Sequence, residues 1–119
     1  MPRFVILRHE PPASYPRGLH WDLMLEARGA LRTWALAEEP RRGATLPAEA
    51  LADHRLAYLD FEGEVSGNRG TVERWDAGTY TIQSCTEARW EIQVWGEQLR
   101  GDAVLQRDPD DMKRWRLEL

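Results

Sequence analysis

Short stretches in which apolar and polar residues alternate recur along the chain, and turn-forming residues separate them. Residues 19–26 alternate most clearly: Leu19, Trp21, Leu23 and Leu25 share one side, and His20, Asp22, Met24 and Glu26 share the other. A period of two residues is typical of a half-buried β-strand. Similar patterns and short apolar runs predict strands or extended segments over residues 4–7, 31–36, 55–61, 71–75, 79–83, 89–95, 103–107 and 113–119.

Turn signals divide these segments, and helical periodicity is almost absent. Three prolines and a glycine predict a loop over residues 10–18, glycines mark a second loop over residues 63–70, and residues 76–78 predict a turn. A single helical turn is expected over residues 46–52. Many short, closely spaced strands favour a mainly β fold, a single compact β-barrel domain of about eight strands over residues 1–119.

Composition narrows the class of protein. The chain has 119 residues, of which 42% are hydrophobic and 30% charged, as in soluble globular domains. No apolar run is long enough to span a membrane and no signal peptide is recognisable, so we expect a cytoplasmic protein without a membrane partner. The formal net charge of −4 argues against coating nucleic acid by bulk charge, so any such contact must be local. Cys85 is alone, which excludes an intrachain disulfide.

Three histidines are the first candidates for chemistry. His20 and Asp22 lie two residues apart, about 7 Å along one face of the expected strand, where an imidazole and a carboxylate can share a divalent ion. His9 ends the preceding strand and can lie alongside them. Glu26 continues this face, either as a partner for a ligating histidine or as an ordinary exposed acid. The alternative for the whole set is a polar strand side that faces solvent.

A second group follows the middle of the chain. His54 and Tyr58 can face a common cleft, although Tyr58 also suits a buried ring whose hydroxyl is hydrogen-bonded. Met24 interrupts the polar face and is more typical of a side chain that fills a gap than of a metal ligand. The glycines of residues 63–70 favour hairpins or bulges over a phosphate-binding loop, because no helix follows them.

Taken together, the motifs resemble a known family. They occur in a consistent order and are His9, residues 19–26 (LHWDLMLE), 34–36 (WAL), 53–63 (DHRLAYLDFEG) and 70–72 (GTV), followed by shorter matches up to Leu117. The series resembles the 3′-phosphoesterase domain of bacterial ATP-dependent DNA ligase D and its small stand-alone relatives. Residues 53–63 are the most specific part of the match.

The resemblance implies a β-barrel that binds one divalent metal, usually Mn²⁺, with Zn²⁺ as the alternative. It implies that His9, His20 and Asp22 are the metal ligands, that His54 contacts the phosphate and assists proton transfer, and that Tyr58 lies beside it. Such a domain removes a 3′-phosphate, and a ribonucleoside before it, from a nucleic-acid 3′ end. The implied partners are that end and a separate ligase or polymerase of end joining, and we expect the protein to be a monomer.

The chain also departs from the family pattern. Met24 stands where the family has a phosphate-binding arginine, Glu38 where it has a lysine, and Ala52 where it has an acidic residue. The loop between the first two histidines is longer than usual. Other arginines are candidates to supply the lost charge, namely Arg8, Arg17, Arg69 and Arg74. Two hypotheses therefore remain: an active phosphoesterase, or a catalytically degenerate barrel that serves as a nucleic-acid-end or protein interaction module.

Overall fold

Nine antiparallel strands and one short 3₁₀ helix make up the computed structural model, which describes residues 1–119. The elements are β1 (Arg3–Glu10), β2 (His20–Ala27), β3 (Ala30–Leu36), β4 (Thr45–His54), η1 (Leu56–Leu59), β5 (Gly63–Glu64), β6 (Thr71–Cys85), β7 (Arg89–Gly96), β8 (Arg100–Asp108) and β9 (Asp111–Glu118). No helix is long and apolar enough to cross a membrane.

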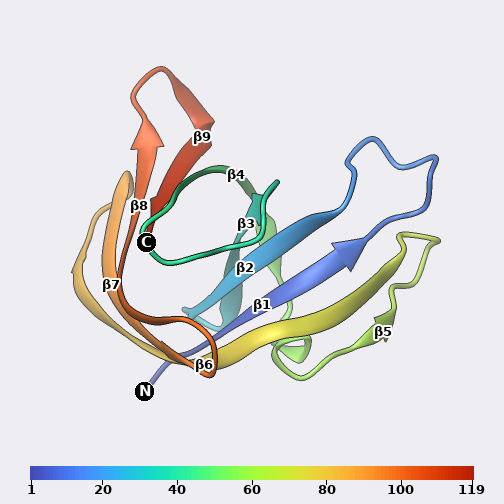
Figure 1. Ribbon diagram of the computed structural model, residues 1–119, viewed down its shortest axis with the longest axis horizontal. Helices are drawn as coiled ribbons and strands as arrows, with labels where there is room; N and C mark the ends of the chain where they lie inside the picture. Colours follow the sequence, from blue (N-terminus) through green and yellow to red (C-terminus); the bar gives the residue numbers. More distant parts are fainter.

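The strands close into a barrel, which confirms the predicted fold class. Neighbours follow the order β1-β2-β3-β4-β9-β8-β7-β6, β6 pairs back with β1, and β5 adds to β6 as an extra strand (Figure 1). Inside, Trp34 packs edge-on against Trp90 and Trp115, with ring centroids 5.7 and 5.4 Å apart. These buried indoles fill much of the interior, so three of the six tryptophans belong to the core.

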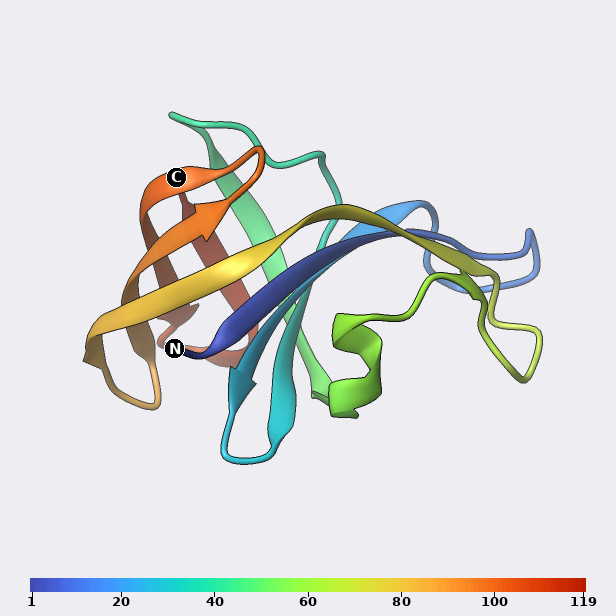
Figure 2. The same cartoon turned by 90° about the horizontal axis from the view of Figure 1, so that it is seen from below.

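A second, smaller core lies on the outer face of β1 and β2. Val5, Leu7 and Met24 are buried there, because Leu59 of η1 and Val65 of the following loop pack over them. Figure 2 shows η1 lying against the outside of the barrel. The polar side of residues 20–26 therefore does not face solvent, since β2 is buried on both faces along most of its length.

Two local predictions are wrong for residues 46–61. Residues 46–52 form part of β4 rather than a helical turn, because Leu46 and Ala48 are buried while Pro47 and Glu49 face outward, and β4 must bridge β3 and β9 to close the barrel. Residues 56–59, expected in a strand or extended segment, form η1, which carries Leu59 into the second core.

The predicted turn at residues 76–78 is also wrong, because β6 runs through it as one strand. Asp76 looks like a turn residue but is buried, and its carboxylate accepts the backbone N–H groups of Glu97, Gln98 and Leu99 at 2.8, 3.2 and 2.8 Å. Gly78 lets β7 approach, since a Cβ there would lie 2.0 Å from the carbonyl oxygen of Trp95. The acid thus anchors the β7–β8 loop to an unbroken strand.

Candidate metal and phosphate site

The ends of β1 and β2 bring three candidate ligands together. His9 and His20 are directly paired across the antiparallel ladder, and Asp22 lies opposite Leu7, two positions further along β2. Because residues two apart share a face, all three side chains leave the same side of the sheet. Their ligand atoms lie within 4.8 Å of one another. The sequence spacing and the strand register together create this cluster.

Backbone carbonyls set the protonation of both imidazoles. His20 Nδ1 lies 2.7 Å from the carbonyl oxygen of Gly18, and His9 Nε2 lies 2.7 Å from that of Arg69. A carbonyl can only accept, so each of these nitrogens carries a proton. The remaining nitrogens, His20 Nε2 and His9 Nδ1, face the carboxylate of Asp22, each 3.2 Å from one of its oxygens. In metal sites, a hydrogen bond from the other ring nitrogen to a carbonyl oxygen commonly fixes the orientation of a ligating histidine.

The carboxylate of Asp22 is buried and incompletely partnered. Its Oδ1 has no hydrogen-bond donor, although His20 Nε2 is nearby. Burial alone raises the pKa of Asp22, but the adjacent His20 and His9 outweigh it and hold that pKa below its usual value. The hydrogen bond to Asp22 in turn raises the pKa of His9. The cluster therefore keeps a buried negative charge that only a proton or a cation can balance.

This donor set fits a divalent metal ion. His9 Nδ1, His20 Nε2 and an oxygen of Asp22 lie within 4.8 Å of one another, and when both imidazoles are neutral their lone pairs repel the carboxylate unless a proton or a cation lies between them. Imidazole and carboxylate together suit borderline and hard cations such as Zn²⁺ and Mn²⁺. His9, His20 and Asp22 are the residues that would hold the ion.

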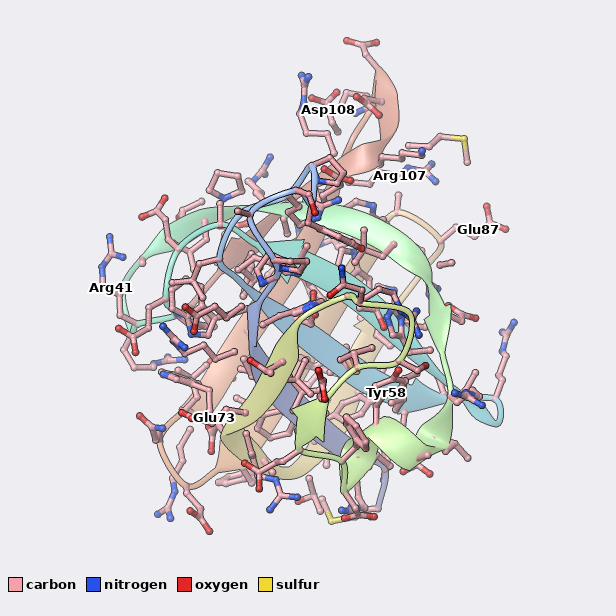
Figure 3. All side chains as sticks on the ribbon, turned by 90° about the vertical axis from the view of Figure 1, so that its right-hand side faces the viewer. Arg41, Tyr58, Glu73, Glu87, Arg107 and Asp108 are labelled. Carbon is pink, nitrogen blue, oxygen red and sulfur yellow. The ribbon has the colours of Figure 1, made fainter.

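A cavity of about 120 Å³ opens beside the cluster. His54 and Tyr58 line it together with the three candidate ligands, and their ring centroids lie 5.6 Å apart in a T-shaped arrangement. His54 Nδ1 donates to the carbonyl of Ala52 at 2.9 Å, which leaves Nε2 as the free ring nitrogen. Tyr58 belongs to η1 and is labelled in Figure 3. The structure thus brings His54 and Tyr58 to the same cavity as the three ligands.

Two of the four candidate arginines line this cavity. Arg17 donates to both carboxylate oxygens of Glu49, at 3.2 and 2.7 Å, and Arg69 donates to the backbone and side chain of Ser66. Arg8 does not line it, because it follows Leu7 on the opposite face of β1, where its guanidinium pairs with Glu10.

Arg74 also lies outside the cavity lining, next to the segment that carries Asp60. Its backbone N–H donates to a carboxylate oxygen of Glu62 at 2.8 Å. The structure thus places Arg17 and Arg69 at the cavity, and Arg8 and Arg74 outside its lining.

Glu26 is not a partner of the histidines. It lies at the far end of β2, where its carboxylate accepts the backbone N–H of Arg3 at 2.8 Å. Six residues along the strand separate it from His20, a distance that a side chain cannot span. The structure therefore does not place Glu26 beside the histidines, in contrast to its expected role as a partner of a ligating histidine.

The three positions that depart from the family pattern differ in their placement. Met24 is fully buried and lines the cavity, so the lost arginine would have pointed into the site. Glu38 is exposed, lies near Arg41 at 3.6 Å and does not line the cavity. Ala52 contributes its carbonyl to His54 but no side chain to the cavity.

Several contributors escaped the sequence analysis. Tyr15 lines the cavity with its ring 6.3 Å from that of His9, and the carbonyls of Gly18 and Arg69 orient the two histidines. The loop between β1 and β2 leads directly into His20. This adjacency in the sequence could have indicated that Tyr15 and Gly18 lie near the site. The loops that carry these groups extend from the same end of the barrel (Figure 1).

Comparisons with known proteins identify the family of this chain. The family model described as the DNA ligase D 3′-phosphoesterase domain matches residues 9–107. A multifunctional non-homologous end joining protein LigD from Pseudomonas aeruginosa is 32% identical over 84 residues, covering 66% of this chain and 9% of that protein. A multifunctional non-homologous end joining DNA repair protein LigD from Mycobacterium tuberculosis is 34% identical over 85 residues, covering 67% of this chain and 10% of that protein. The chain thus spans about a tenth of the length of these curated relatives.

Proposed function

We propose, since this chain belongs to the DNA ligase D 3′-phosphoesterase domain family, that it is a divalent-metal-dependent phosphoesterase acting on nucleic-acid 3′ ends. The reaction would remove a terminal 3′-phosphate, and a ribonucleoside before it, to leave a 3′-hydroxyl. The relatives are named as end-joining proteins, so a ligase or polymerase of end joining is the expected protein partner.

One observation supports this function most strongly. Two imidazole nitrogens face a buried, incompletely partnered carboxylate, and backbone carbonyls hold both rings in that orientation. Such an arrangement is unfavourable without a positive group at its centre. We propose that His9, His20 and Asp22 hold Mn²⁺, with Zn²⁺ as the alternative. When bound, the ion would polarise a phosphoryl oxygen and orient the attacking water.

His54 would transfer the proton that this reaction requires, and Tyr58 would position His54. Hydrolysis forms a bond between the water oxygen and phosphorus and breaks the bond from phosphorus to the 3′ oxygen. The attacking water loses one proton to solvent, and the 3′ oxygen gains one. His54 Nε2 is the free ring nitrogen at the cavity, so a protonated His54 is placed to supply it. Tyr58 packs against the His54 ring and limits its orientation.

The cavity has the right size for a phosphate group. Its volume of about 120 Å³ equals about four water molecules at roughly 30 Å³ each. Because Met24 stands where the family has an arginine, the cavity wall lacks one cation. Arg17 and Arg69 line the cavity from the two flanking loops. We propose that these arginines bind the phosphate oxygens in place of that cation.

A phosphate-release assay tests this function. An oligonucleotide that ends in a 3′-phosphate should release inorganic phosphate with Mn²⁺ and release none with a chelator. His54→Gln should lower the rate by about 100-fold or more, because general acid–base groups contribute at least this much. Glu26→Gln is the matched control, since Glu26 lies at the far end of β2.

The buried Met24 favours one alternative, a catalytically degenerate barrel that binds nucleic-acid ends or a protein. A charge-assisted hydrogen bond of the kind it replaces contributes about 1.5–3 kcal/mol. Metal and oligonucleotide binding without phosphate release would support this alternative over the enzyme.

A further inference from the structure

A larger groove adjoins the proposed phosphate cavity. Its volume is about 490 Å³, and it runs from the start of β2 across β3 and β4 to the start of β9. Arg17 and His20 line both the groove and the cavity, so the two are continuous. The groove thus begins at a candidate metal ligand and leads away from it.

The walls of this groove carry cations, although the chain is acidic overall. Three cations, Arg17, Lys113 and Arg114, line it beside two acids, Glu49 and Asp111. Lys113 is the only lysine of a chain with a net charge of −4. Arg114 is 70% exposed, with its carboxylate neighbours in the β8–β9 turn 3.7 and 3.9 Å away, so its guanidinium is free to move to another anion. In Figure 3, Asp108 marks this hairpin and Tyr58 marks the cavity.

The floor is made of small side chains. Ala35, Ala37, Pro47 and Ala48 leave space between the charged walls, where a larger side chain would fill the groove. Sites for small molecules commonly measure about 300–1,000 Å³. The groove lies in this range and the cavity beside it does not.

We propose that this groove binds the sugar–phosphate backbone of the nucleotides that precede the 3′ end, with Lys113 and Arg114 contacting their phosphates. This inference rests on the proposed function and names the form of its substrate: a single strand several nucleotides long rather than a free nucleotide. The terminal phosphate would occupy the cavity, and Arg17 would lie between it and the next phosphate. Phosphate contacts of this kind bind without reading sequence.

Glu49 opposes this binding. Its carboxylate lies in the groove, and its pairing with Arg17 holds the pKa of Glu49 below its usual value, so it stays charged at neutral pH. A strand would have to compete with Glu49 for the guanidinium and approach a like charge. Glu49→Gln should therefore tighten oligonucleotide binding, a gain that misfolding cannot produce.

The test measures affinity against strand length. Deoxynucleotides of one to six residues, each ending in a 3′-phosphate, compete in chelator against a fluorescent hexanucleotide, and anisotropy reports binding. Affinity should rise with length and level off once the groove is filled. Lys113→Gln/Arg114→Gln should weaken hexanucleotide binding about tenfold and remove most of the length dependence. The slope of log affinity against log salt should fall by about 1.4, because each contact to a single strand contributes about 0.7.

The matched control removes the same charge elsewhere. Arg28→Gln/Arg100→Gln alters two exposed arginines that line neither the groove nor the cavity, and it should bind within about twofold of the parent. Equal affinity of the groove variant and the control, or no tightening in Glu49→Gln, would overturn the proposal.

Phosphate release by the parent protein separates the two proposals. If the parent releases no phosphate while the groove variant still loses affinity, the hydrolysis is wrong and the groove is supported. If the parent releases phosphate while the groove variant binds like the control, the groove is wrong and the hydrolysis is supported.

Discussion

Replacing Asp22 by asparagine removes the charge of the candidate metal cluster while keeping the size of the side chain. Asp22 is only 3% exposed, and nitrogens of His9 and His20 lie 3.2 Å from its two oxygens. The asparagine amide can donate to one of these nitrogens, so the metal-free protein should still fold. The variant keeps the two histidines but loses the anion that attracts a divalent cation.

The expected effect follows from linkage. A ligand at 100 times its dissociation constant stabilises the fold by about 2.7 kcal/mol if it binds only the native state. A chain of 119 residues unfolds with an entropy of about 0.25 kcal/mol/K, so this energy corresponds to a Tm increase of about 11 °C. The parent should show such an increase with Mn²⁺, and Asp22→Asn should show less than about 2 °C.

Thermal unfolding followed by tryptophan fluorescence measures these shifts, since the chain contains six tryptophans. Calorimetry first gives the dissociation constant that sets the metal concentration. Glu26→Gln makes the same change of acid to amide on the same strand, away from the cluster, and should keep the full shift. A full Mn²⁺ shift in Asp22→Asn, or no shift in the parent with either Mn²⁺ or Zn²⁺, would refute the metal assignment.

Three further predictions test other parts of the structure. Met24→Arg should raise the rate of phosphate release at least tenfold by restoring a cation to the cavity wall, whereas Glu38→Lys should change it less than twofold, because Glu38 lies outside. Burial raises the pKa of Tyr80 to about 12, so the contribution of the neutral Tyr80 hydroxyl to stability is complete below pH 10 and is lost as pH rises through 12. In a spectrophotometric titration, Tyr80→Phe should remove the phenolate that forms near pH 12. Asp76→Ala should lower the free energy of unfolding in urea by about 3–5 kcal/mol, since three backbone N–H groups of the β7–β8 loop and that of Ala77 lose their acceptor. A loss below about 1 kcal/mol would contradict this role.

Prediction of the fold succeeded where local pattern and tertiary environment agree. Residues 89–95 alternate and lie in β7, whose inner face fills the barrel, and the apolar end of residues 31–36 lies in β3, which is buried on both faces there. It failed where closure of the barrel overrides local signals. Pro47 and the neighbouring alanines suggested a helical turn, but β4 is needed between β3 and β9. Asp76 resembled a turn residue because its distant hydrogen-bond partners cannot be seen in the sequence.

The candidate site was predicted in part for similar reasons. The two-residue spacing of His20 and Asp22 places both on one face of any strand. His9, His54 and Tyr58 were also candidates from the sequence, and the family resemblance added their expected roles. The second core was not foreseen, although it is what buries Asp22 and makes its charge costly. The sequence offered four arginines as replacements for the cations of the family pattern, and only the arrangement of the loops brings two of them to the cavity.

The order of residues along the chain thus determined the strand-forming pattern, the chemical types at the site and their spacing within each strand, because these depend on near neighbours alone. The tertiary structure decided which histidine pairs with which, which carbonyl holds each imidazole proton, and where the cationic groove begins. Those features depend on strand register and on loops that bring residues such as His9 and Arg69 together across 60 positions, and such long-range contacts form only when the barrel closes.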